Sequence, residues 1–387
     1  MATQFKFIMQ KNYVSRTLVY ALIASIALQP TFLLAATDLT DAPLIVQSRV
    51  KPNILFTLDN SGSMLWETIT GTDATAAYNS GKTNRAFYSP TFNKLYYNPA
   101  ITYLPAVKYD SLAPTFTSSM GNSPVAAARI NPFFSTNTDT VDLRQSCWGK
   151  ESAVLPLYDA SSFVKNDNCR DSSSATYSKK YARYAFYYSW KTTNTATENP
   201  GSNQNSDTYY SRVEITPDTP TYSRAASRTD CGMGNTCTYA QELQNFANWF
   251  TYYRTRIATA KSSLGIAFSA LDGKSRVGFS TINNNSGSEN TKASNFVALA
   301  NFDSAQKLTW YNRVYGIDPD GGTPLVTALD RAGQYYTSGT MPGASSTTLR
   351  NVTVPLACTP NYTILSTDGY WNGGAPANVG NLDRKVP

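Results

Sequence analysis

Residues 54–64 read ILFTLDNSGSM, an apolar run that leads straight into an oxygen-rich turn. The apolar run is typical of a parallel strand that is buried on both faces. In the turn, Asp59, Ser61 and Ser63 place one carboxylate and two hydroxyls at alternate positions. Ligands of open α/β sheets bind where such strands end, and a set of hard oxygens suits Mg²⁺ or a similar hard cation.

Two distant segments decide how this turn is interpreted, because any polar turn uses Asp, Asn, Ser and Gly. Residues 321–325 read GGTPL, a loop followed by the start of a helix, and residues 362–369 read YTILSTDG, a second buried strand that ends in Asp-Gly. In this order the three segments resemble the metal-ion-dependent adhesion site (MIDAS) of von Willebrand factor type A domains. The resemblance implies one metal site built from five oxygen-bearing side chains, those of Asp59, Ser61, Ser63, Thr323 and Asp368.

The same resemblance implies a fold and a chemistry. The fold is α/β and von Willebrand factor A-like, with a Rossmann-like, mostly parallel sheet flanked by helices. The implied ion is Mg²⁺, with Mn²⁺ and Ca²⁺ as alternatives, and Asp368 is expected to act on it through a water molecule. Because Mg²⁺ retains several waters, a carboxylate from a partner could displace one of them. No nucleophile or positioned general base is visible near the motif, so we expect a binding protein and not an enzyme.

A second resemblance begins at residues 95–105, which read LYYNPAITYLP. This segment resembles the Tyr-Asn-Pro segment of the PilC/PilY family of type IV pilus tip proteins, and KPNI at residues 51–54 and TDGYWN at residues 367–372 also look like that family. The resemblance implies pilus components, namely pilins and minor pilins, as partners, together with a host or surface ligand that has an accessible carboxylate. It favours metal-dependent adhesion at the pilus tip with support of pilus biogenesis. The alternative is a structural assembly or capping module in which the metal is dispensable.

Four regions follow from the order of these signals. Residues 1–36 have basic residues, an apolar stretch and a small-residue end, the layout of a secretory signal peptide. The apolar stretch is shorter than the roughly 20 residues needed to span a bilayer, so we expect export to the periplasm and cell surface with no membrane span after signal removal. Residues 37–66 hold the lead-in, the first strand and the first metal loop of the von Willebrand factor A-like domain. Residues 67–237 form an insertion rich in Tyr, Ser, Thr and Asn, and residues 238–387 form the remainder of the domain. Few residues follow Asp368, so the sheet is expected to be incomplete at the C terminus.

The composition excludes several classes of functional site. The 387 residues carry a formal net charge of +7 and no histidine. Lysines and arginines are scattered without a basic run, so the charge does not predict nucleic-acid binding. Without imidazole, Ser-His-Asp and Cys-His nucleophilic sites and His-ligated zinc sites are excluded.

The five cysteines fit an exported chain in an oxidising compartment. Cys231 and Cys237 enclose a short loop that is flexible enough to close, and Cys147 could pair with Cys169 across a longer one. Cys358 is then left over. Because connectivity cannot be deduced from sequence, these pairings remain disulfide candidates.

Periodicity predicts the remaining elements. Apolar residues at three-and-four spacing from 243 to 271 predict one long helix over the sheet, with a capping box at Thr238 and Gln241. Alternating aromatics at 184–190 predict a strand that could pair with 209–215 in the mainly β and loop insertion. Further strands are expected at 277–282 and 296–300. Helices are expected around 308–315 and after Pro324, with Thr323 a candidate for the N-cap or for the metal.

Overall fold

The computed structural model describes the chain in segments, and every element below belongs to the compact unit Lys51–Pro387. The described residues are 50–69, 85–109, 118–133, 139–144, 149–150, 153–154, 185–191, 209–232, 234–283, 295–338, 341, 359–369 and 371–373. The expected signal peptide and most of the lead-in lie outside them. So do three of the cysteines, Cys147, Cys169 and Cys358.

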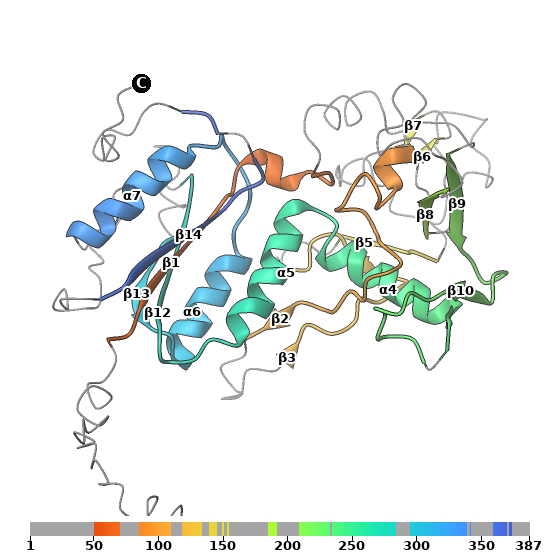
Figure 1. Cartoon of the computed structure of the whole chain (residues 1–387), viewed down its shortest axis with the longest axis horizontal. Helices are drawn as coiled ribbons and strands as arrows, with labels where there is room; N and C mark the ends of the chain where they lie inside the picture. The colour runs from red at the N-terminus through yellow and green to blue at the C-terminus, as the bar shows by residue number, and fades with distance from the viewer. Residues whose placement is uncertain are drawn as a thin grey trace, which may run out of the picture. The chain divides into compact units, whose positions relative to one another are not determined.

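A four-stranded sheet forms the centre of the α/β part, with the order β13-β12-β1-β14 (Figure 1). The strands are β1 (Asn53–Leu58), β12 (Arg276–Thr281), β13 (Val297–Asn301) and β14 (Asn361–Ser366). Strand β1 is parallel to both β12 and β14, and β13 runs antiparallel at one edge. The register places Leu58 opposite both Thr281 and Ser366, so the three parallel strands end at the same edge of the sheet.

Helices cover both faces of this sheet, as Figure 1 shows. Helices α5 (Arg256–Ser269) and α6 (Ser304–Tyr315) pack on the face that carries Phe56, in one hydrophobic core. Helix α7 (Leu325–Ser338) packs on the opposite face against Leu55. The alternation of Leu55 and Phe56 between two cores explains why β1 reads as a continuous apolar run. The predicted α/β class is thereby confirmed, with a mixed sheet between helical layers.

The predicted long helix is wrong in one respect, because the chain forms two helices in its place. Helix α4 (Tyr239–Tyr252) begins with the predicted capping box at Thr238 and Gln241, and α5 follows after a break at residues 253–255. Thr255 caps α5 by accepting a hydrogen bond from the backbone N–H of Ala258. At the break the Thr259 hydroxyl donates to the Tyr253 carbonyl oxygen at 2.7 Å, which satisfies a backbone group that the helix no longer pairs.

The break separates two environments. Of these two helices only α5 packs on the sheet. The apolar face of α4, including Phe246 and Trp249, joins a second core that is rich in aromatic residues between 87 and 222. Side chains stabilise the junction between the two helices. Ser262 donates to the Tyr252 carbonyl oxygen at 2.6 Å, and Arg254 pairs with the buried Glu67 at 2.9 Å. Apolar spacing continues through both helices, so periodicity alone does not reveal the break.

Short strands and turns make up the rest of the described chain. The predicted pairing of aromatic strands is confirmed by β8 (Ala185–Trp190), which is antiparallel to β9 (Tyr210–Ile215). The short elements are η1 (Gly62–Leu65), η2 (Arg85–Tyr88), β2 (Val107–Lys108), β3 (Ser118–Ser119), β4 (Ala128–Arg129), β5 (Thr140–Val141), β6 (Gly149–Lys150), β7 (Ala153–Val154), β10 (Thr221–Ser223) and β11 (Thr236–Thr238). Among the described residues, no helix combines the length and the apolar character needed to cross a membrane.

Lys261 on α5 links that helix to the end of α6. It is 1% exposed and donates from Nζ to the carbonyl oxygens of Tyr315 at 2.8 Å and Ile317 at 2.6 Å. Burial lowers the pKa of Lys261 to about 7, and the negative charge of Asp318 opposes this shift. The ammonium therefore loses its proton in the folded state well before a lysine in the unfolded chain does.

This difference predicts that stability rises with pH above neutrality. Between the folded pKa of about 7 for Lys261 and the unfolded value near 10.4, the unfolded state binds more protons. The free energy of unfolding should then increase by up to about 1.4 kcal/mol per pH unit. Urea unfolding of the wild type and of Lys261→Met between pH 6 and about 9 measures this, the upper limit being set by tyrosine ionisation in the unfolded chain. Equal pH slopes for the two proteins would contradict it.

Candidate metal centre

Asp59 is the first residue after β1, and its carboxylate is enclosed by hydrogen-bond donors. The residue is 0% exposed. Its Oδ1 accepts from the backbone N–H of Ser61 at 2.8 Å and from the Ser61 hydroxyl at 2.6 Å. Its Oδ2 accepts from the hydroxyl of Thr367 at 2.7 Å. The carboxylate is thus fixed between the first strand and the end of β14.

The two serines of the first loop lie beside this carboxylate. The Ser61 and Ser63 hydroxyl oxygens are 3.0 Å apart, so the oxygens of all three motif residues form one connected cluster. The short helix η1 starts directly behind it, with Met64 N–H donating to the Ser61 carbonyl oxygen at 3.0 Å. The alternate spacing in the sequence therefore does bring one carboxylate and two hydroxyls together.

The second loop, residues 320–323, is bound to the first through backbone groups. Gly62 N–H donates to the Gly321 carbonyl oxygen at 3.0 Å, and Asp320 N–H donates to the Asn60 carbonyl oxygen at 2.7 Å. Asn283, just after β12, joins both loops: its N–H donates to Asn60 Oδ1 at 3.0 Å, and its Nδ2 donates to the Gly322 carbonyl oxygen at 2.6 Å. Three segments distant in sequence are thereby held at one edge of the sheet.

Thr323 lies in this second loop and is 7% exposed. Its backbone is clamped by Asn372, which accepts from Thr323 N–H at 2.7 Å and donates to the Thr323 carbonyl oxygen at 2.9 Å. Helix α7 begins two residues later, at Leu325, so the side chain does not stand at the N-cap position. Within the described part of the chain, the Thr323 hydroxyl has no hydrogen-bond partner and is free to meet a ligand.

Asp368 reaches the same edge, but its carboxylate is turned to a different partner. The third loop is attached to the first through Asp59 N–H, which donates to the Ser366 carbonyl oxygen at 2.8 Å. The Asp368 carboxylate forms an ion pair with Arg256, with Oδ2 and Nη1 2.5 Å apart and side chains 9% and 10% exposed. The structure thus joins Asp59, Ser61 and Ser63 directly, and it places Thr323 and Asp368 on loops bonded to them.

The donor set is the one that a hard cation prefers. It consists of a carboxylate and hydroxyls, without nitrogen or sulfur ligands. Within the described residues, no lysine or arginine forms an ion pair with Asp59, and the donors on its carboxylate are the Ser61 N–H and the Ser61 and Thr367 hydroxyls. No group of three or more His, Cys, Asp or Glu side chains occurs there either, so an ion at this edge would depend on the serine and threonine hydroxyls.

Sequence reasoning missed several residues that shape this centre. Thr367 is the clearest, because the register of β1 and β14 pairs Leu58 with Ser366, the residues directly before Asp59 and Thr367. Knowledge of that register would have identified it. Asn60 and Asn283 bridge the first two loops, and nothing in their spacing signals this. Arg256 falls within the helix predicted for residues 243–271, and its contact with Asp368 depends on the break before α5.

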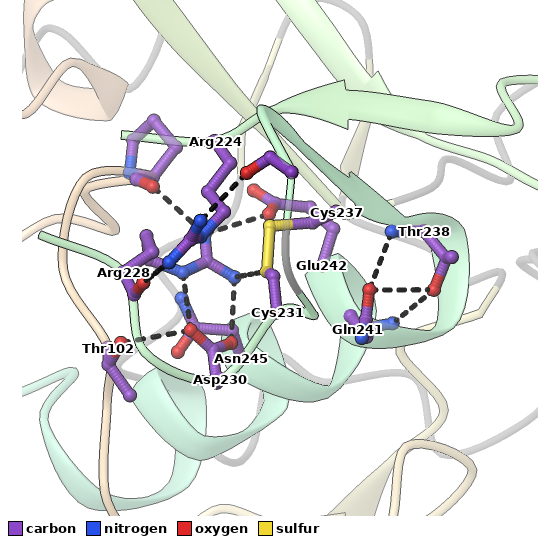
Figure 2. Close-up of a disulfide and its surroundings, with 12 residues drawn as sticks. Thr102, Arg224, Arg228, Asp230, Cys231, Cys237, Thr238, Gln241, Glu242 and Asn245 are labelled. Atoms are coloured by element: carbon purple, nitrogen blue, oxygen red, sulfur yellow. Dashed lines mark hydrogen bonds and ion pairs between the residues drawn. A yellow bond between two sulfur atoms is a disulfide. The ribbon is translucent and has the colours of Figure 1, made fainter. Parts of the chain in front are cut away.

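A second polar cluster surrounds a disulfide near the start of α4 (Figure 2). The predicted pair Cys231–Cys237 is confirmed, with the Cα atoms 5.2 Å apart. The guanidinium of Arg228, which is 0% exposed, forms ion pairs with Asp230 at 2.7 Å and with Glu242 at 2.9 Å. Glu242 also accepts from the Tyr97 hydroxyl at 2.7 Å. This cluster ties the Tyr-Asn-Pro segment to α4 and to the disulfide loop.

Fold and centre together define an α/β domain with a buried, oxygen-rich cluster where its parallel strands end. The sequence of this domain is similar to that of the type IV pilus biogenesis factor PilY1 of Pseudomonas aeruginosa. The match to the protein of strain UCBPP-PA14 is 29% identical over 354 residues, which is 91% of this chain, and that of strain PAK is 26% identical over 363 residues, 90% of this chain. The predicted resemblance to the PilC/PilY family is thereby confirmed.

The matched region is a limited part of those relatives. The chain spans about a quarter of their length, 26% in both cases. No protein-family model matches the chain, and no solved structure matches it.

Proposed function

We propose that this chain is an exported, metal-ion-dependent recognition domain of a type IV pilus system. It binds a partner carboxylate through a Mg²⁺-type ion and supports pilus biogenesis. The convergence of three loops on the buried Asp59 carboxylate carries the proposal. The name of the relatives, pilus biogenesis factor, supports a place in pilus assembly, and it describes an assembly role and not catalysis.

In the proposed metal site, each of the five predicted residues has a role. Asp59 supplies the negative charge, and Ser61, Ser63 and Thr323 supply neutral oxygens. Asp368 contributes from the neighbouring loop. Mg²⁺ is the preferred ion, with Mn²⁺ and Ca²⁺ as alternatives, because all the donors are hard oxygens. The parallel arrangement of β12, β1 and β14 supports a von Willebrand factor A-like fold for this centre.

The proposed partners follow from the charge that the centre leaves on the ion. A single coordinating carboxylate neutralises half the charge of a divalent cation, so an acidic group from outside completes the shell favourably. Pilins and minor pilins are the proposed assembly partners at the pilus tip. A host or surface molecule with an accessible carboxylate is the proposed adhesion ligand.

The direct test is cation binding by the full chain. Calorimetric titration with Mg²⁺ or Mn²⁺ should show one site, and Asp59→Asn should weaken it about 100-fold or more, because the buried charge is lost while the side-chain shape is kept. At a concentration 100 times the Kd, the ion should stabilise the folded chain by about 2.7 kcal/mol. Asp272→Asn is the matched control, since the Asp272 side chain is 57% exposed and bound to Lys274. Equal cation affinity in wild type and Asp59→Asn would overturn the proposal.

A structural role without metal is the second candidate, and one observation favours it. Hydrogen bonds already occupy both Asp59 oxygens and tie the three loops together, so the edge of the sheet is held without an ion. Cells whose chain carries Asp59→Asn distinguish the two functions. Normal piliation with lost attachment supports metal-dependent adhesion, whereas normal piliation with normal attachment supports the structural role.

A further inference from the structure

The ion pair between Arg256 and Asp368 bears on the charge of the candidate metal centre. Asp368 directly follows Thr367, whose hydroxyl donates to Asp59 Oδ2. Its own carboxylate is nevertheless bound to Arg256, and both side chains are about nine-tenths buried. A buried pair of this kind interacts more strongly than a surface pair, because solvent screens it less.

Arg256 is held in place by contacts other than Asp368. Its Nε donates to the Thr68 carbonyl oxygen, and its backbone N–H donates to the Trp66 carbonyl oxygen at 3.0 Å. The guanidinium carbon lies 5.2 Å from the centre of the Trp66 ring, a cation–π distance. The positive charge is therefore fixed at the start of α5 and does not sample solvent freely as a surface arginine would.

A cavity lies next to the ion pair between Arg256 and Asp368. Arg256, Asp368 and Thr367 line a cavity of about 280 Å³ together with Met64 from η1 and other residues. A side chain at a cavity wall can rotate without displacing packed neighbours, in contrast to one enclosed in a dense core. A cation bound beside Asp59 would compete with Arg256 for the same carboxylate.

We propose that Arg256 is a positioning residue that holds Asp368 away from the metal and thereby weakens cation binding. The inference rests on the proposed metal function and names the residue that regulates it. With Asp368 neutralised by Arg256, the ion is bound mainly by Asp59 and the hydroxyls and keeps positive charge for a partner carboxylate. Arg256 thus lowers the affinity of the centre for the ion and raises the affinity of the bound ion for an acidic ligand.

The test is a charge series in the full chain, with Mn²⁺ and Mg²⁺ titrated by calorimetry. Arg256→Gln frees Asp368 and should tighten binding about 10-fold, the scale of one partly screened unit charge at close range. Asp368→Asn leaves Arg256 unopposed and should weaken binding by about the same factor. The double variant Arg256→Gln/Asp368→Asn removes one charge of each sign and should return near the wild-type Kd, because the two single effects are opposite in sign and similar in size.

Two controls separate charge from structure. Arg256→Lys keeps the charge but loses the Nε hydrogen bond to the Thr68 carbonyl oxygen, so its Kd should lie between those of the wild type and Arg256→Gln. Arg276→Gln removes an arginine at the opposite ends of the strands, where Arg276 is paired with Asn53 in the register, and should leave the Kd unchanged. If Arg256→Gln alone does not fold, Arg256→Met, which keeps the apolar stem of the side chain without its charge, takes its place and should likewise tighten binding about 10-fold.

The outcomes distinguish this inference from the proposed function. Wild-type binding that depends on Asp59, with equal affinities throughout the Arg256 and Asp368 series, overturns the role of Arg256 and leaves the metal function standing. Cation binding that is absent, or independent of Asp59, overturns both. Weaker binding in Arg256→Gln than in wild type, with Arg276→Gln unchanged, also overturns the inference.

Discussion

Replacing Arg228 with methionine is expected to lower the free energy of unfolding by about 3–5 kcal/mol, the usual cost of removing one partner from a buried ion pair. The guanidinium is 0% exposed and forms ion pairs with both Asp230 and Glu242, the latter also 0% exposed. Without it, the Glu242 carboxylate would keep only the Tyr97 hydroxyl as a side-chain donor among the contacts described. Chemical denaturation at pH 7 measures the loss.

The same variant has a predictable pH dependence. Burial already raises the pKa of Glu242, and the positive charge of Arg228 opposes that shift. Loss of the guanidinium should raise the pKa of Glu242 further. The folded state then binds a proton that the unfolded state has released, so stability falls as pH rises through this range. Arg228→Met should accordingly lie closer to wild type at pH 5 than at pH 7.

Arg144 provides the matched control for Arg228. It also pairs with an aspartate, Asp142, at 2.7 Å, but its side chain is 56% exposed. Exposed ion pairs contribute about 0–1 kcal/mol, so Arg144→Met should change the free energy of unfolding by less than about 1 kcal/mol. Similar losses in Arg228→Met and Arg144→Met would show that burial of the Arg228 cluster has no energetic consequence.

The sequence predicted a helix or strand correctly where its own residues determine it, as an apolar run or a capping pair does. The apolar run before Asp59 became β1, and the Thr238 and Gln241 pair became a capping box. The break between α4 and α5 could not be predicted, because the apolar spacing continues across it. The Ser262 hydroxyl binds the freed Tyr252 carbonyl oxygen, and Glu67 pairs with the Arg254 side chain in the break. Tertiary contacts decide such a point, and a single sequence does not display them.

In the candidate metal centre, too, contacts within one loop could be predicted and contacts between distant segments could not. Spacing within one turn predicted that Asp59, Ser61 and Ser63 would meet, because residues at alternate positions of a tight loop share one side. The roles of Thr367 and Arg256 depend on strand register and on where a helix starts. Both residues act on the predicted ligands, through a hydrogen bond to Asp59 and an ion pair with Asp368, and the long-range pairing that creates these contacts has no local signature.

Replacing Trp310 with alanine is expected to lower the free energy of unfolding by about 3–5 kcal/mol, because a large aromatic side chain leaves a cavity that its neighbours refill only in part. Trp310 is 0% exposed on α6 and stacks on Phe268 with ring centres 4.4 Å apart. Its indole N–H donates to the Gly278 carbonyl oxygen at 3.3 Å, which ties α6 to the middle of the sheet. Urea unfolding monitored by circular dichroism measures the loss.

Trp371 is the matched control, because it is the same residue type at 65% exposure, beside Asn372 in the third loop region. Its replacement by alanine removes little buried surface and should stay within about 0.5 kcal/mol of wild type. The difference between the two variants therefore isolates the contribution of the core between α5, α6 and the sheet. If both tryptophan variants unfold at the same urea concentration, burial of the Trp310 side chain between α6 and the sheet does not stabilise the domain, and the prediction is wrong.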